Sequence, residues 1–195
     1  APVKVSHERN ADDLAFLVAH DSDGFVRWDA MQTLWMEHFD TNVNATVDPV
    51  TTLGGLAKGA LTLETPEQQM LAATMLAVPN ENYLFEQLRG FDVDALLDAR
   101  DAAVANAAQA HAETWAALVA LHDTGQAYQA DAAGMARRAL GNTAFSYLAK
   151  VQTGDALEEL LQARYAKADN LTDRRTVLAI ACRHTGISDA FKDSL

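Results

Sequence analysis

Apolar side chains recur at intervals of three and four residues along most of the chain, which is the spacing of one face of an α-helix. Between residues 25 and 39 this stripe carries Trp28, Met31, Leu34 and Trp35. Similar stripes predict roughly nine or ten antiparallel helices joined by short turns. The other predicted helices cover residues 10–20, 53–63, 66–78, 80–90, 93–122, 131–151, 155–167 and 170–186, and one more begins at Ser188.

Residue types that begin helices stand at several of these boundaries. Thr65, Pro66 and Gln68 form the strongest such signal. A threonine N-cap, a proline at the first helical position and a glutamine at the third together make a capping box. The other expected N-caps are Asn10, Asp92 and either Asn170 or Thr172.

Two segments depart from the helical pattern. Residues 41–50 are polar and end in Asp48-Pro49, so we expect a loop there. The helix over residues 53–63 is the weakest prediction, because glycine lowers helix propensity and three glycines fall at 54, 55 and 59.

The first residues alternate in hydrophobicity with a period of two, as in a β-strand. Val3 and Val5 carry this pattern, so residues 1–9 are predicted to be a strand-like linker. A strand this short needs a sheet beside it. The chain also begins with Ala1 and not with methionine, which is compatible with a processed chain or with a piece of a longer protein.

Alanine makes up roughly a fifth of the chain, and it has both the highest helix propensity and a small side chain. Helices rich in alanine approach one another closely, near ~8 Å between axes. The predicted fold is therefore all-α, a stack of antiparallel helical hairpins similar to a solenoid.

Charge and composition limit the partners. The chain has 27 acidic and 15 basic residues and a net charge of −12, which argues against a nucleic-acid partner. No apolar run reaches the roughly 18–20 residues that span a bilayer, so no membrane partner is expected. One cysteine cannot form an internal disulfide framework. With no signal-peptide pattern, the predicted location is cytoplasmic.

Candidate chemistry is sparse. His111-Ala112-Glu113 matches the H-x-E of zinc deaminases, but the accompanying P-C-x-x-C is absent, so His111 is interpreted as an ordinary surface histidine of a helix. No two histidines have the spacing of a zinc-protease helix, and no phosphate-binding loop or nucleophile elbow occurs. The chain alone is predicted to be inactive, with no catalytic or metal-binding residue and no cofactor of its own.

The single cysteine, Cys182, is flanked by apolar residues at helical spacing. The favoured interpretation is a buried structural thiol. Activation of the thiol by the neighbouring Arg183 and His184 is the less favoured alternative. Earlier in the chain, Arg27 and Asp29 are expected on the solvent side of their helix, with Trp28 as an anchor in the core.

An ordered series of segments resembles the C-terminal helical region of bacterial aminopeptidase N, a family of zinc aminopeptidases of the gluzincin group. Each segment is modest alone, but they follow one another in register across nearly the whole chain. The segments are residues 1–4 (APVK), 20–23 (HDSD), 25–32 (FVRWDAMQ), 136–142 (ARRALGN) with Tyr147-Leu148, and 168–174 (ADNLTDR).

The resemblance implies an armadillo-like or HEAT-like superhelix that follows a β-sandwich domain and helps to enclose an active-site chamber. Residues 1–9 are then the linker from that sandwich. Residues 10–195 are a helical domain that is truncated at its C-terminal end, because the family region continues further. Zinc and the catalytic H-E-x-x-H and G-x-M-E-N motifs then belong to another part of the same polypeptide, because neither motif occurs here. The implied partners are the catalytic and β-sandwich domains and peptide substrates. The residues that carry the family pattern, in a structural capacity, are Arg27, Trp28, Asp29, Asn142, Asn170, Thr172 and Asp173.

Two functional hypotheses follow. The first is a non-catalytic helical segment of a zinc aminopeptidase that admits short peptides to its chamber. The alternative is a free-standing helical scaffold that binds a partner protein in a groove.

Overall fold

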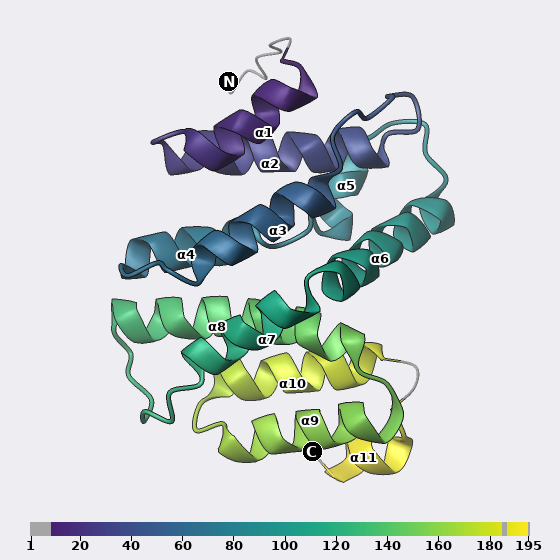
Figure 1. The fold of residues 1–195 in the computed structure, drawn as a ribbon. Coiled ribbons are helices and arrows are strands. Elements are labelled where there is room, and N and C mark those ends of the chain that lie inside the picture. Colours follow the sequence, from purple (N-terminus) through teal and green to yellow (C-terminus); the bar gives the residue numbers. More distant parts are fainter. Residues whose placement is uncertain (1–8, 185–186, 195) are drawn as a thin grey trace.

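The computed structural model describes residues 9–184 and 187–194, and every regular element within these ranges is an α-helix (Figure 1). This confirms the all-α prediction. The strand predicted at Val3 and Val5 lies outside the described residues. The helices are α1 (Ala11–His20), α2 (Gly24–Phe39), α3 (Pro49–Ala60), α4 (Pro66–Met75), α5 (Glu81–Gln87), α6 (Val93–Ala110), α7 (Ala112–His122), α8 (Ala132–Val151), α9 (Gly154–Lys167), α10 (Leu171–Arg183) and α11 (Asp189–Ser194).

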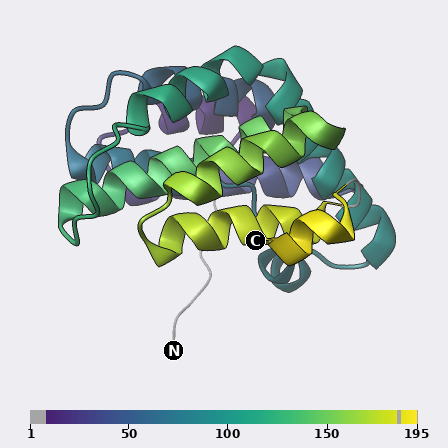
Figure 2. The same ribbon diagram turned by 90° about the horizontal axis from the view of Figure 1, so that it is seen from below.

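The helices are stacked in successive layers along one direction (Figure 1). At one end α1 packs along α2, and at the other α7 packs along α8 and α9 along α10. Seen along the stack, α8, α9 and α10 run side by side (Figure 2). The predicted stack of helical hairpins is therefore confirmed.

The predicted N-caps account for where several helices begin. Thr65 accepts a hydrogen bond from the Gln68 backbone N–H, and the Gln68 side chain accepts one from Thr65, which completes the capping box. The side chain of Asn10 caps α1, that of Asp92 caps α6 and that of Asn170 caps α10. Local hydrogen bonding thus fixes these boundaries independently of the core.

Helix α3 begins earlier than the sequence pattern indicated. The expected loop over residues 41–50 ends at Asp48, whose carboxylate accepts a hydrogen bond from the Val50 N–H at 3.0 Å, and Pro49 occupies the first turn. An aspartate N-cap followed by proline is a helix start, so the prediction of a loop through residue 50 is wrong.

The single helix predicted over residues 93–122 is wrong, because the chain breaks at His111 into α6 and α7. His111 leaves helical geometry, with φ −125° and ψ 27°. Its Nε2–H donates to the Val50 carbonyl at 3.0 Å, and its ring packs edge-to-face against Trp115. The same ring lies where a side chain of Gly54 would be, so α3 and the α6–α7 junction meet only because residue 54 has no Cβ. His111 is therefore half-buried in a packed joint, not an ordinary surface residue as the sequence suggested.

Helix α8 is buried on two sides and separates two apolar clusters. Leu140, Ala144 and Tyr147 face the larger cluster, which is built mainly from α1–α7. Phe145 and Ala149 face a smaller cluster formed with α9 and α10. Small residues at several of these positions let helices pack on both sides of α8 at once.

Replacement of Gly54 by alanine tests the joint between α3 and His111. The new methyl group would overlap the imidazole ring and displace it from the Val50 carbonyl, so we expect a loss of about 1–3 kcal/mol in the free energy of unfolding. Gly55→Ala is the matched control, because a Cβ there meets no atom within 4 Å. That control should stabilise the helix by about 0.5–1 kcal/mol. Urea unfolding of both variants measures the difference, and two equal shifts would contradict the proposed close packing.

Candidate functional site

The residues that carry the family pattern divide into two groups at opposite ends of the stack. Arg27, Trp28 and Asp29 lie on α2, near the N-terminal end. Arg27 is half-buried and its Nε donates to the Val18 carbonyl at 2.9 Å, so the expectation that it faces solvent is wrong. Its hydrogen bond instead ties α2 to the last turns of α1.

Trp28 and Asp29 are also half-buried. The Trp28 indole lies between two other aromatic rings, 5.8 Å from Phe25 and 6.4 Å from Tyr83, measured between ring centroids. It packs against the edge of the larger cluster, so it anchors α5 against α2 at the periphery and not in the centre of the core.

Asn142, Asn170 and Asp173 come together in one hydrogen-bond network near the C-terminal end. Asn142 on α8 is buried, and its Nδ2 donates to Asp173 Oδ1 at 2.7 Å. Asn170 Nδ2 donates to Asp173 Oδ2 at 2.8 Å. Arg164 on α9, which the sequence analysis did not single out, donates to Asn142 Oδ1 at 3.1 Å. The network thus joins three helices through groups that the sequence separates widely.

Thr172 does not take part in this network. It is exposed, and only its backbone carbonyl accepts a hydrogen bond, from the Thr176 hydroxyl at 3.1 Å. The capping role that the sequence left open between Asn170 and Thr172 belongs to Asn170.

Next to the network lies a hollow of about 370 Å³, which we call the arginine hollow. It opens between the α7–α8 loop, α8, α9 and the turn before α10. Its charged lining residues are Arg137, Arg138, Arg164, Lys167, Asp123, Asp169 and Asp173, and His122 also lines it.

The α7–α8 loop is held over this hollow by side chains from the end of α9 and from the turn before α10. Asp169 accepts a hydrogen bond from the Tyr128 N–H at 2.6 Å, and Lys167 pairs with Asp123 at 2.7 Å. Close approach also matters, because a Cβ on Gly134 would stand 2.5 Å from the Gln129 carbonyl oxygen. The loop is therefore held in place although it has no helical hydrogen bonds of its own.

Two titratable groups at the hollow respond to this environment. Burial lowers the pKa of the His122 imidazole below its ordinary value of 6.5, and the nearby Arg137 charge lowers it further. Hydrogen bonds from Asn170 and from the Tyr128 backbone lower the pKa of the Asp169 carboxyl group. Both shifts favour a neutral imidazole and an ionised carboxylate at neutral pH.

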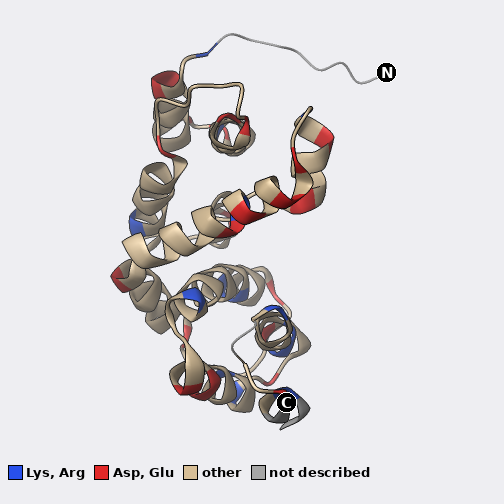
Figure 3. Cartoon of the chain, turned by 90° about the vertical axis from the view of Figure 1, so that its right-hand side faces the viewer, with Lys and Arg blue, Asp and Glu red and all other residues tan. Residues whose placement is uncertain are grey.

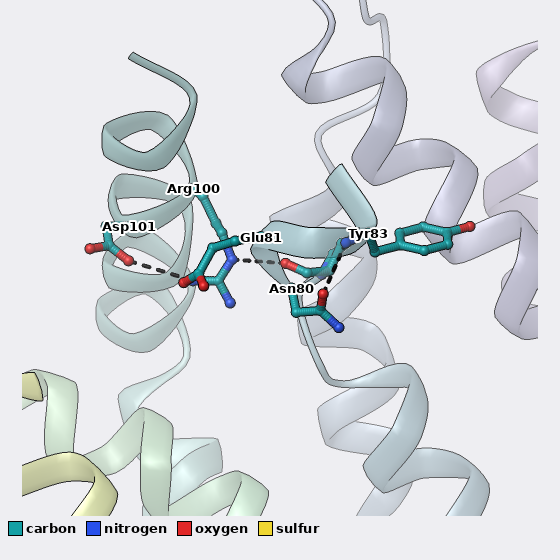
Figure 4. Close-up of polar contacts among 6 residues, drawn as sticks. Asn80, Glu81, Tyr83, Arg100 and Asp101 are labelled. Atoms are coloured by element: carbon teal, nitrogen blue, oxygen red, sulfur yellow. Dashed lines mark hydrogen bonds and ion pairs between the residues drawn. The ribbon is translucent and has the colours of Figure 1, made fainter. Parts of the chain in front are cut away.

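A second polar cluster surrounds Arg100 on α6 (Figure 4). The Arg100 Nε donates to the Pro79 carbonyl at 2.8 Å, and its guanidinium lies 3.6 Å from Asp101 and 3.9 Å from Glu81. Asn80 beside it caps α5 by accepting from the Tyr83 N–H at 2.9 Å. Arg100 has partners on every side and fastens α6 to the start of α5, so we assign it a structural role.

The expectation of a buried thiol at Cys182 is wrong, because Cys182 is exposed. The buried stripe of α10 runs through Val177 and Ala181, which turns the next residue toward solvent. Within residues 9–184 and 187–194, no group of three histidine, cysteine or acidic side chains is placed to hold a metal ion. The described residues therefore offer no site that fits zinc.

A family model described as "Domain of unknown function (DUF3458_C) ARM repeats" matches residues 11–193. The chain belongs to this ARM-repeat family. The match agrees with the armadillo-like architecture that the resemblance implied and extends over all eleven helices described here, apart from the last residue of α11.

Curated relatives of this ARM-repeat domain carry the name aminopeptidase N. That of Escherichia coli (strain K12) is 28% identical over 187 residues, which cover 93% of this chain and 21% of that protein. That of Caulobacter vibrioides is 30% identical over 183 residues, covering 89% and 20%. The chain thus spans about a fifth of the length of these relatives. The resemblance to the C-terminal helical domain of aminopeptidase N-like proteins is confirmed.

A solved structure shares the fold of the ARM-repeat chain. It is the crystal structure of Legionella pneumophila aminopeptidase A in complex with aspartic acid, with a TM-score of 0.76 and 19% sequence identity. The matched region covers 93% of this chain and 22% of that one. The arrangement of helices is therefore retained where most side chains differ.

Replacement of Asn142 by alanine tests the buried network. The change removes the amide that joins Asp173 to Arg164 and leaves both charged groups short of a partner, so we expect a loss of about 1–3 kcal/mol in the free energy of unfolding. Thr172→Ala is the control from the same family pattern and should change stability by less than about 0.5 kcal/mol. Equal losses in the two variants, measured by urea unfolding, would contradict the network.

The pKa of His122 gives a pH-dependent prediction. A group whose pKa is lower in the folded state binds fewer protons there, so folding loses stability as the pH falls below the unfolded value of 6.5. Between about pH 7.5 and about pH 5.5, the wild-type chain should therefore lose stability relative to His122→Gln. Urea unfolding of both chains at each pH measures this, and an unchanged difference between them would count against the buried imidazole.

Proposed function

We propose that this chain is a non-catalytic helical segment of a zinc-dependent aminopeptidase that removes N-terminal residues from peptides. The observation that carries the proposal is the match to relatives named aminopeptidase N over about nine-tenths of this chain and a fifth of their length. The catalytic and β-sandwich domains of the same polypeptide are its partners. Zinc and the hydrolytic chemistry reside in the catalytic domain.

In this proposal the stacked helices form a wall that helps to enclose the active-site chamber and limits entry to short peptides. Acidic residues recur along α6 (Figure 3), and the exposed Asp94 and Asp98 there provide negative charge that would attract the positive N-termini of peptides.

We further propose that the intact enzyme is located in the cytoplasm, as expected from the sequence. Among the helices that the structure describes, none is both long and apolar enough to cross a bilayer.

Hydrolysis of aminoacyl anilides tests whether the catalytic activity lies outside this chain. The purified chain should release no product and should retain no stoichiometric zinc, because the residues that the structure describes include no ligand set for the ion. The complete polypeptide that contains this chain should hydrolyse the same substrates and lose activity when a chelator removes zinc. Chelator-sensitive turnover by the purified chain alone would overturn the proposal.

The coding sequence around this chain separates the proposal from a free-standing scaffold. An H-E-x-x-H motif encoded upstream in the same reading frame is the expected result. A reading frame that encodes only the helical stack would favour a scaffold that binds a partner protein in a groove.

A further inference from the structure

We propose that the arginine hollow is a binding site for a carboxylate group, contributed either by an acidic side chain of a peptide segment or by a small free carboxylate. The inference goes beyond the proposed function and does not depend on it. It rests on the way three arginines are placed around one concave surface.

The arginines of the hollow donate their hydrogen bonds to neutral groups. Arg137 donates to the neutral Gln126 side chain, at 2.5 Å. Arg138 donates to the Gln129 carbonyl at 2.9 Å and stands 4.5 Å above the Tyr128 ring. Neither has a carboxylate oxygen within 4.0 Å among the described residues.

Arg164 on α9, across the hollow from Arg137 and Arg138, is also held by neutral groups. Its guanidinium donates to the Asn142 amide oxygen and lies 5.2 Å from the Phe145 ring centre. Its Nε is buried and has no hydrogen-bond partner in the part of the chain that the structure describes. A guanidinium held against an apolar ring is screened by water less than one at the surface, so its field acts strongly across the hollow.

The arginines of the hollow differ in their partners from Arg100 on α6. The chain carries 27 acidic residues and a net charge of −12, so carboxylates to pair with arginine are plentiful. Arg100 lies within 4.0 Å of two of them, Glu81 and Asp101. The three arginines of the hollow instead donate their hydrogen bonds to neutral groups, which fixes their positions. The Arg138 charge also acts on Asp169, but none of the three forms an ion pair within 4.0 Å among the described residues, so their N–H donors remain available to a ligand.

The charges and the size of the hollow indicate which ligand fits it. Four cations and three carboxylates line the hollow, so its formal excess is one positive charge. That excess matches a singly charged carboxylate. A doubly charged phosphate would bring more negative charge than the excess neutralises, and the lining aspartates would repel it. Guanidinium groups also present paired N–H donors that fit the two oxygens of a carboxylate. A volume of about 370 Å³ accommodates a side chain or a small acid.

The test measures binding to the 195-residue chain by NMR, following the arginine Nε–H signals and the Tyr128 amide. The probes are acetate, inorganic phosphate, an acetylated and amidated alanine peptide with one central glutamate, and the same peptide with glutamine in its place. We expect the glutamate peptide to shift these signals and the glutamine peptide to leave them unchanged. Acetate that binds as tightly as the glutamate peptide would identify the free acid as the source. Tighter binding of the peptide would identify a peptide segment.

Variants assign the site. Arg137→Gln and Arg138→Gln should each weaken binding of the glutamate peptide about tenfold, because each removes a charged donor. Arg175→Gln on α10 is the matched control, since it makes the same change of charge at an exposed arginine outside the hollow. Thermal unfolding of all three confirms that they fold. Equal weakening by all three, tighter binding of phosphate than of carboxylate, or no shift with any carboxylate would each overturn the proposal.

Discussion

The contact between Tyr147 and the end of α4 holds the rest of the stack in register. The buried Tyr147 hydroxyl donates to the Leu76 carbonyl at 2.7 Å, and its ring stacks on Trp115 with 4.3 Å between ring centres. Three helices, α4, α7 and α8, therefore meet at one side chain. Burial raises the pKa of this hydroxyl, so it stays a donor at any physiological pH. Because this contact fixes one side of α8, the opposite side of the helix can pack against α9 and α10.

The local parts of this fold were predictable, because their causes lie within a few residues of one another. Thr65, Asn10 and Asp92 cap their helices as expected, since a cap needs only a side-chain oxygen and a nearby N–H. The break at His111 was not predictable in this way. The alanine-rich sequence continues through this position without a change of pattern. The helix is interrupted where the imidazole donates a hydrogen bond to the Val50 carbonyl on a distant helix. The prediction of a buried thiol at Cys182 was wrong for a related reason, since the buried face of α10 depends on which helices lie beside it.

The candidate site was less predictable than the helix boundaries, because its residues come from distant parts of the sequence. The resemblance marked Asn142, Asn170 and Asp173, but no spacing in the sequence indicates that they share one hydrogen-bond network. Arg164 completes that network from α9 and carries no local signal, because an arginine on an amphipathic helix normally faces solvent. The adjacent pair Arg137-Arg138, in a chain with nearly twice as many acids as bases, was the one available pointer to the arginine hollow.

Two neighbouring regions of the molecule use charge in opposite ways, and this division follows from packing. Along α6 the acidic side chains are exposed, and the Arg100 guanidinium is neutralised by Glu81 and Asp101 (Figures 3 and 4). Around α8 the arginines are held by amides, carbonyl groups and aromatic rings, which fix their positions without cancelling their charges. Helices crowded on both sides of α8 keep these groups rigid, and rigid charges lose little entropy when a ligand binds. The packing that places α9 and α10 against α8 therefore also sets the three arginines around one concave surface.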